Sequence, residues 1–157
     1  MTCAWRLKTP PADGLVALTL AEAKAQVGTT VTADDALLTA FVASVTRAAE
    51  RQLGRALLTQ TWLCTLTGWA ARIWLPMAAP LQSVVVTYYD ADGTLQTLDS
   101  AVYTVHDHSE AEPAYLTLAP GQAWPAVLDR DGAVVIEYVC GYTTAALLAA
   151  AVPDVLL

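Results

Sequence analysis

The sequence predicts an α+β fold with N-terminal helices, a β-rich middle of about six mostly antiparallel strands, and a C-terminal helical segment. Up to residue 54, apolar residues recur at three- and four-residue spacing, and from residue 59 they alternate with polar ones. The last stretch, TTAALLAAAVPDVLL, again has helical composition. We therefore expect an extended arm over 1–17 and a single domain over 18–157, helical over 18–54, β-rich over 59–142 and helical over 143–157.

The N-terminal arm contains Pro10-Pro11 and Asp13-Gly14, which favour turns and polyproline-like backbone. It also carries Trp5. A tryptophan on such a segment is costly to leave in water, so we expect it to dock on its own domain or on a neighbouring subunit.

Two helices are predicted next. Thr19 and Glu22 form a capping box, and Gly28 is a typical helix stop, so a short helix is expected between them. A longer helix is expected after Thr32, its predicted N-cap, with an end at Gly54. Its apolar positions at helical spacing are Leu37, Leu38, Phe41, Val42, Val45, Ala49 and Leu53.

The β-rich middle is divided by turn residues. Strands are expected within 59–69, 71–76, 77–98, 101–106, 113–125 and 133–143. The motifs DADG (90–93) and DRDG (129–132) resemble the start of a calcium loop but lack its later ligands. We interpret both as tight turns, in which Asp and Gly supply the unusual backbone angles.

Composition limits the function. The chain is 55% hydrophobic and 15% charged, with a net charge of −7. The apolar excess suggests surfaces buried against partners, and the acidic balance argues against a protein that grips phosphate. No apolar run reaches the roughly 18–20 residues of a membrane span. Cys3, Cys64 and Cys140 are odd in number and widely spaced, which favours free buried thiols.

Two other functions stay open from the residues. His106 and His108 are spaced to share one face of a strand and, with Glu110 or Glu112, could bind a metal ion in a small enzyme; a solvated loop is the alternative. The tryptophans at positions 62, 69 and 74 could instead form the binding surface of a β-rich ligand-binding module, or could pack in the core.

Arg47, Arg51 and Arg55 lie at helical spacing across the helix end at Gly54. The first interpretation is that these cations cap the last carbonyl groups of the helix and are otherwise solvated. A salt bridge between subunits is the second interpretation, and contact with DNA is the third.

The order of these segments resembles the head–tail connector (adaptor) proteins of tailed phages, prophages and phage-like gene transfer agents. The resemblance is carried by LTLAEAKAQV (18–27), DDALLTAFVASVTRAAERQLGRALLTQTW (34–62), PLQSVVVTYYDADGTLQTL (80–98) and VIEYVCGYTTA (135–145). VPDVLL (152–157) resembles the start of the family's last helix, whose long continuation is absent here.

The resemblance implies a structural role in the neck of a virion or particle assembled in the bacterial host cytoplasm. Such proteins form a ring, usually of twelve subunits, between the portal and the stopper or tail-completion proteins. The ring extends the DNA channel without binding DNA specifically, and it has no enzymatic activity, cofactor or membrane association. Expected subunit-interface residues are Trp5, Leu37, Phe41, Arg47, Arg51 and Arg55; expected portal or neck contacts are Pro153, Asp154, Val155, Leu156 and Leu157.

Overall fold

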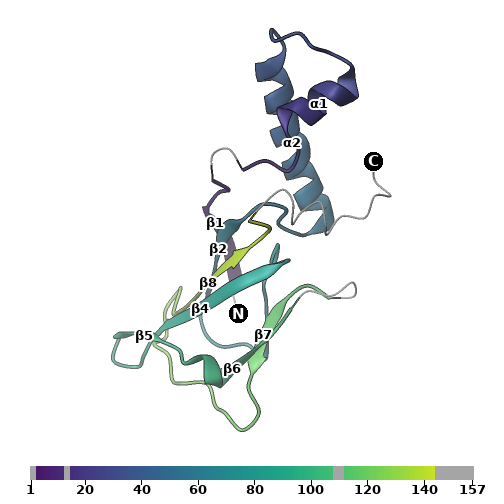
Figure 1. The fold of residues 1–157 in the computed structure, drawn as a ribbon. Coiled ribbons are helices and arrows are strands. Elements are labelled where there is room, and N and C mark those ends of the chain that lie inside the picture. Colours follow the sequence, from purple (N-terminus) through teal and green to yellow (C-terminus); the bar gives the residue numbers. More distant parts are fainter. Residues whose placement is uncertain (1–2, 13–14, 108–111, 144–157) are drawn as a thin grey trace.

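The computed structural model describes residues 3–12, 15–107 and 112–143, which form two α-helices and eight strands in two antiparallel sheets (Figure 1). A 3-10 turn, Ser100–Val102, precedes β6. The helices are α1 (Leu20–Val27) and α2 (Asp35–Leu53). The strands are β1 (Cys3–Thr9), β2 (Gln60–Leu66), β3 (Arg72–Trp74), β4 (Leu81–Tyr89), β5 (Leu95–Thr97), β6 (Tyr103–His106), β7 (Tyr115–Leu118) and β8 (Val134–Cys140).

The predicted α+β class is wrong, because the described chain is mostly β. Residues 3–9 were expected to belong to an extended arm, but they form an edge strand that pairs antiparallel with β2. Such long-range pairing leaves no local mark beyond the alternation of CAWRLKT. Of the expected C-terminal helical segment over 143–157, Thr143 lies in a bend, and 144–157 fall outside the described residues.

The larger sheet has the order β1-β2-β8-β4-β5, and the smaller sheet has the order β3-β7-β6. Strand β8 lies in the middle of the larger sheet, which explains its dense β-branched sequence. Its inward residues have no exposed surface: Val134, Ile136, Tyr138 and Cys140.

The hydrophobic core lies between the two sheets. Cys64 of β2 and Val86 of β4 come from the larger sheet, and Ile73 of β3 and Leu116 of β7 come from the smaller one. The Tyr138 hydroxyl donates to the Pro76 carbonyl oxygen at 2.8 Å and so links β8 to the segment after β3. Within the described residues, neither helix contributes to this core. The β part therefore buries its own apolar faces without the helices.

The end of each helix follows local rules in three of four cases. The Thr19 backbone N–H donates to Glu22 at 2.8 Å and the Glu22 N–H donates to Thr19 Oγ1 at 3.2 Å, which confirms the capping box. Gly28 and Gly54 both adopt the left-handed conformation that ends a helix, as predicted.

The predicted N-cap of the long helix is wrong. Asp34, not Thr32, is the N-cap, and its side chain makes no capping hydrogen bond. Thr32 instead begins a turn, because its carbonyl oxygen accepts from the Asp35 N–H at 3.2 Å. Asp35 pairs with Lys24 at 2.6 Å, and this ion pair holds α1 against α2.

Turn chemistry and cysteines agree with the sequence analysis. Asp90 Oδ1 accepts from the N–H groups of Asp92 and Thr94 at 3.1 and 2.8 Å, so DADG is a turn closed by its own aspartate. Cys64 and Cys140 are both buried, and Cys140 is a free thiol. Burial, followed by the nearby charge of Glu50, raises the pKa of Cys140 to about 12. The thiol therefore stays protonated at neutral pH and is a poor nucleophile.

Gly141 follows β8 where the chain passes very close to another backbone segment. It has a φ of 96°, and a Cβ atom there would collide with the backbone carbonyl of Leu58. Gly121 has a comparable φ of 76° but nothing within 4 Å of its Cβ position.

We predict that Gly141→Ala lowers the free energy of unfolding by about 3 kcal/mol or more, because strain and collision add. Gly121→Ala, which carries the strain alone, should cost about 1–2 kcal/mol. Urea denaturation of both variants measures the difference. Equal losses would contradict the close backbone approach at Gly141.

Candidate functional site

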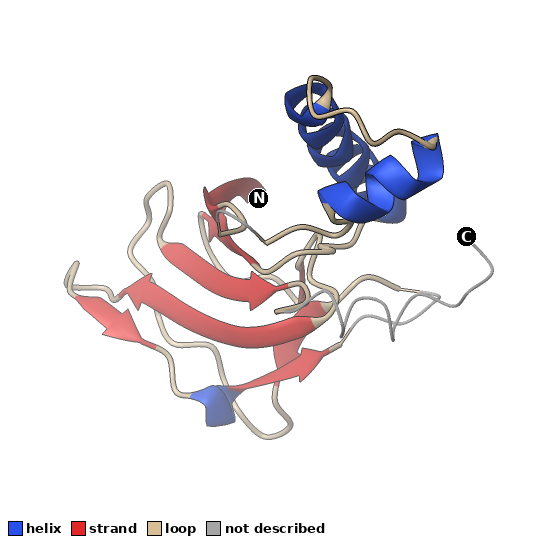
Figure 2. Ribbon diagram, turned by 45° about the horizontal axis from the view of Figure 1, so that its top comes forward, coloured by secondary structure: helices blue, strands red, loops and turns tan. Residues whose placement is uncertain are grey.

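The two helices stand together beyond one end of the β layers, as Figures 1 and 2 both show. Helix α2 exposes large apolar side chains: Leu37, Phe41 and Val45 are 54%, 56% and 66% exposed. Residues four apart differ by about 40° around a helix, so the three form one stripe, which we call the ridge. The only buried residue of α2 is charged, Glu50. This helix thus reverses the usual placement of apolar and charged groups.

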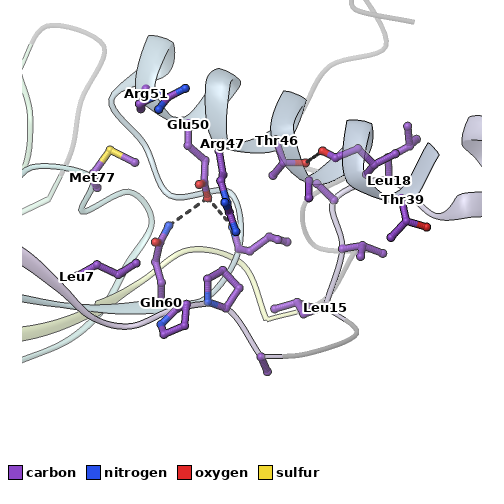
Figure 3. A pocket seen from close by; sticks show the side chains of 18 of the residues that line it. Leu7, Leu15, Leu18, Thr39, Thr46, Arg47, Glu50, Arg51, Gln60 and Met77 are labelled. Carbon is purple, nitrogen blue, oxygen red and sulfur yellow. Dashed lines mark hydrogen bonds between the residues drawn. The ribbon is translucent and has the colours of Figure 1, made fainter. Parts of the chain in front are cut away.

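A groove lies along the opposite side of α2 (Figure 3). It has a volume of about 890 Å³ and is bounded by α2, residues 10–12 and 15–20, and strand β2. Leu15, Leu18, Val42 and Ala43 are among its apolar lining residues. Its polar lining residues are Thr19, Thr39, Thr46, Arg47, Glu50, Arg51 and Gln60. The size and the mainly apolar lining are typical of a binding cleft.

Glu50 fastens the end of α2 to the start of β2. Its Oε1 atom accepts from the backbone N–H groups of Leu57 at 2.9 Å and Leu58 at 3.4 Å, and from the Gln60 side-chain amide at 3.0 Å. Figure 3 shows Glu50 and Gln60 pointing toward each other across the groove floor. A buried carboxylate is tolerated only with such donors, so Glu50 holds the junction in one geometry.

The junction is completed by backbone contacts. The Arg55 N–H donates to the Glu50 carbonyl oxygen at 3.2 Å, and the Ala56 N–H donates to that of Met77 at 3.0 Å. The Thr59 N–H donates to the Tyr142 carbonyl oxygen at 3.1 Å. The chain therefore passes from helix to sheet through a hydrogen-bonded segment that leaves little freedom for α2 to swing.

Arg47 and Arg51, predicted interface residues, are exposed and line the groove. Within the described part of the chain their side chains make no hydrogen bond or ion pair, and the end of α2 is capped instead by backbone N–H groups of Gly54 and Arg55. For Arg47 and Arg51 the capping part of the first interpretation is therefore wrong, whereas their exposure agrees with its solvated part. Among the described residues, a chain of net charge −7 thus keeps two cations without an ion-pair partner at its groove.

The remaining predicted interface residues lie in three places. Leu37 and Phe41 are on the ridge. Arg55 follows the helix and forms an isolated bridge with Met77. Trp5 is on edge strand β1, 45% exposed, and donates from Nε1 to the Trp74 carbonyl oxygen at 3.4 Å. The predicted portal contacts at 153–157 fall outside the described residues.

The described histidine of the predicted metal motif, His106, contacts other side chains of the smaller sheet. His106 Nε2 lies 2.9 Å from Thr117 Oγ1, and its ring stacks on Tyr115 with the ring centres 4.4 Å apart. Glu112, a predicted metal ligand, is 3.3 Å from Arg72. The described residues include no group of three potential metal ligands, and His108 and Glu110 lie outside them.

The tryptophans of the β part make mostly internal contacts. Trp69 stacks on Trp124 with the ring centres 4.5 Å apart and donates to the Pro125 carbonyl oxygen at 2.8 Å. Trp74 is 39% exposed and is partly covered by the Arg72 guanidinium, 5.1 Å from the ring centre. Trp62 lines the groove, and its buried Nε1 atom has no hydrogen-bond partner.

In the described chain, no helix is long and apolar enough to span a membrane.

The groove and the hydrogen bonds of Glu50 were not predicted from the sequence. One signal was available: Glu50 follows Val42 and Thr46 at four-residue steps, so an acid occupies the stripe that faces the sheet. A charge on an inward stripe indicates a buried acceptor that needs nearby donors. Gln60 and the N–H groups of Leu57 and Leu58, seven to ten residues on, are those donors.

No protein-family model matches this chain, and no curated protein matches it. Solved structures do. A chain in "Neck of empty GTA particle computed with C6 symmetry" has a TM-score of 0.68 at 20% identity, over 89% of this chain and 72% of that one. This chain shares its fold with a component of a gene transfer agent neck.

Two further particle structures contain similar chains. One in "Virion of native gene transfer agent (GTA) particle" has a TM-score of 0.62 at 20% identity, with coverage of 87% and 73%. One in "Neck of native GTA particle computed with C12 symmetry" has a TM-score of 0.59 at 23% identity, with coverage of 87% and 71%. The resemblance to head–tail connectors is confirmed at the level of the fold.

We predict that Glu50→Ala lowers the free energy of unfolding by about 2–3 kcal/mol, because it leaves buried N–H groups without an acceptor. Glu50→Gln keeps an acceptor oxygen and should lose less. Gln52→Ala, an exposed change on the same helix, is the control. Urea denaturation followed by circular dichroism measures all three variants, and a loss no larger for Glu50→Ala than for Gln52→Ala would contradict the role of Glu50.

Proposed function

We propose that this protein is a structural head–tail connector that forms a ring, of twelve copies, in the neck of a phage-like particle. The observation that carries the proposal is the exposed ridge on a helix that the β core does not need. Burial of each ridge side chain is worth about 1.5–3 kcal/mol. None of the described residues buries these side chains, so we expect the gain to come from a partner, and the simplest partner in a ring is the next copy.

The comparisons support a particle component with rotational symmetry. Two of the similar chains lie in necks computed with C6 and C12 symmetry. A ring closes through head-to-tail contacts, in which each copy offers two different surfaces. The fold of this chain, with a helical pair standing clear of the sheets, suits such contacts (Figure 2).

The ring would join the portal to stopper or tail-completion proteins and extend the DNA channel. We assign the portal or neck contact to 153–157, as the resemblance implies. A net charge of −7 suits a wall that repels phosphate and lets DNA slide. The particle neck is the proposed location, reached by assembly in the bacterial host cytoplasm.

A structural role also fits the groups that could otherwise do chemistry. The Glu50 carboxylate is held by three donors, which suits a fixed acceptor better than a general base. The raised pKa of Cys140 keeps that thiol protonated. His106 is engaged by Thr117 and Tyr115. We therefore propose no enzymatic activity.

The test compares two matched changes of exposed apolar residues. Phe41→Asp, on the ridge, should abolish ring assembly, because it places a charge in the contact; Leu95→Asp, on β5 and 55% exposed, should leave assembly unchanged. Light scattering and negative-stain micrographs of the protein, alone and with portal-bearing particles, measure assembly. A wild-type protein that neither forms rings nor joins such particles would contradict the proposed function.

A further inference from the structure

We propose that the ridge of one copy inserts into the groove of the next copy, so that both surfaces of the ring contact come from helix α2. The ridge is Leu37, Phe41 and Val45, and the groove is the cleft between α2, residues 10–12 and 15–20, and strand β2. This inference rests on the proposed ring and names the surfaces that build it.

The two surfaces lie on different sides of one helix. With 100° between successive residues, the ridge covers about 80° of the α2 surface. Groove-lining Val42 and Thr46 then lie about 140° and 180° around from Leu37. A copy built in this way presents a projecting surface to one neighbour and a hollow one to the other. Head-to-tail closure of a ring requires this pair of unlike surfaces.

The two surfaces also match in polarity. Leu15, Leu18, Val42 and Ala43 give the groove apolar walls. Its volume of about 890 Å³ would hold about thirty water molecules, which ridge side chains would displace from apolar surface. Ala43 is small and exposed, so it leaves room for an aromatic ring such as that of Phe41.

Rotational symmetry sets the direction of the contact. Neighbouring copies in a ring of twelve differ by a rotation of about 30°, so their α2 helices run nearly parallel and the ridge of one copy faces the groove side of the next.

The test mixes two variants, each of which lacks one of the two surfaces. Phe41→Asp loses the ridge but keeps the groove, and Ala43→Arg fills the groove but keeps the ridge. Each alone should be monomeric. Their equimolar mixture should give a one-to-one heterodimer by native mass spectrometry at about 100 μM, and no ring, because only one productive contact remains.

The outcomes separate the inference from the proposed function. If wild-type protein forms rings and Ala43→Arg does so equally well, or if the mixture stays monomeric, the groove is not the receptor and the inference fails while the ring stands. If wild-type protein does not assemble, the proposed function fails. A peptide of residues 144–157 is also tested against the Phe41→Asp monomer. If the peptide binds, and if adding Ala43→Arg to the same monomer abolishes its binding, the groove is the site of that segment and the inference is overturned.

Discussion

The position of the helical pair depends on one buried carboxylate. Glu50 ties the last turns of α2 to the N–H groups of Leu57 and Leu58 and to the amide of Gln60 at the start of β2. This contact fixes the angle at which α2 leaves the sheet. It therefore fixes both the direction of the ridge and the existence of the groove, since Glu50 and Gln60 are part of the groove lining.

The β sheets and helix α2 have different roles in the rest of the structure. The sheets bury a core of their own, with Ile136 and Tyr138 of β8 at its centre, and no described residue of either helix belongs to it. Helix α2 is then free to keep Leu37, Phe41 and Val45 on its surface. The favourable free energy of burying these side chains would be gained on assembly. Stability of the fold and formation of the proposed ring are thus carried by different residues.

Local features were predictable and long-range ones were not. The ends of α1 and the stop at Gly54 follow from neighbouring residues, so sequence found them. The pairing of β1 with β2 depends on an open sheet edge that no local pattern reveals. The sequence therefore predicted an extended arm where β1 lies. Helical spacing placed Leu37 and Phe41 on an apolar stripe of α2, and the family resemblance made them interface candidates, but neither could say which stripe faces the sheet. The groove needs three segments brought together, and no local pattern encodes that.

A reconstruction of the neck of a particle that contains this protein tests the central claim most directly. The side chain to observe is Phe41. The account predicts that Phe41 of every copy packs against α2 of the next copy, beside Val42 and Thr46, with Glu50 still bound to Gln60. A map in which this protein occupies the neck but Phe41 faces solvent, or in which the protein is absent from the neck, would contradict it.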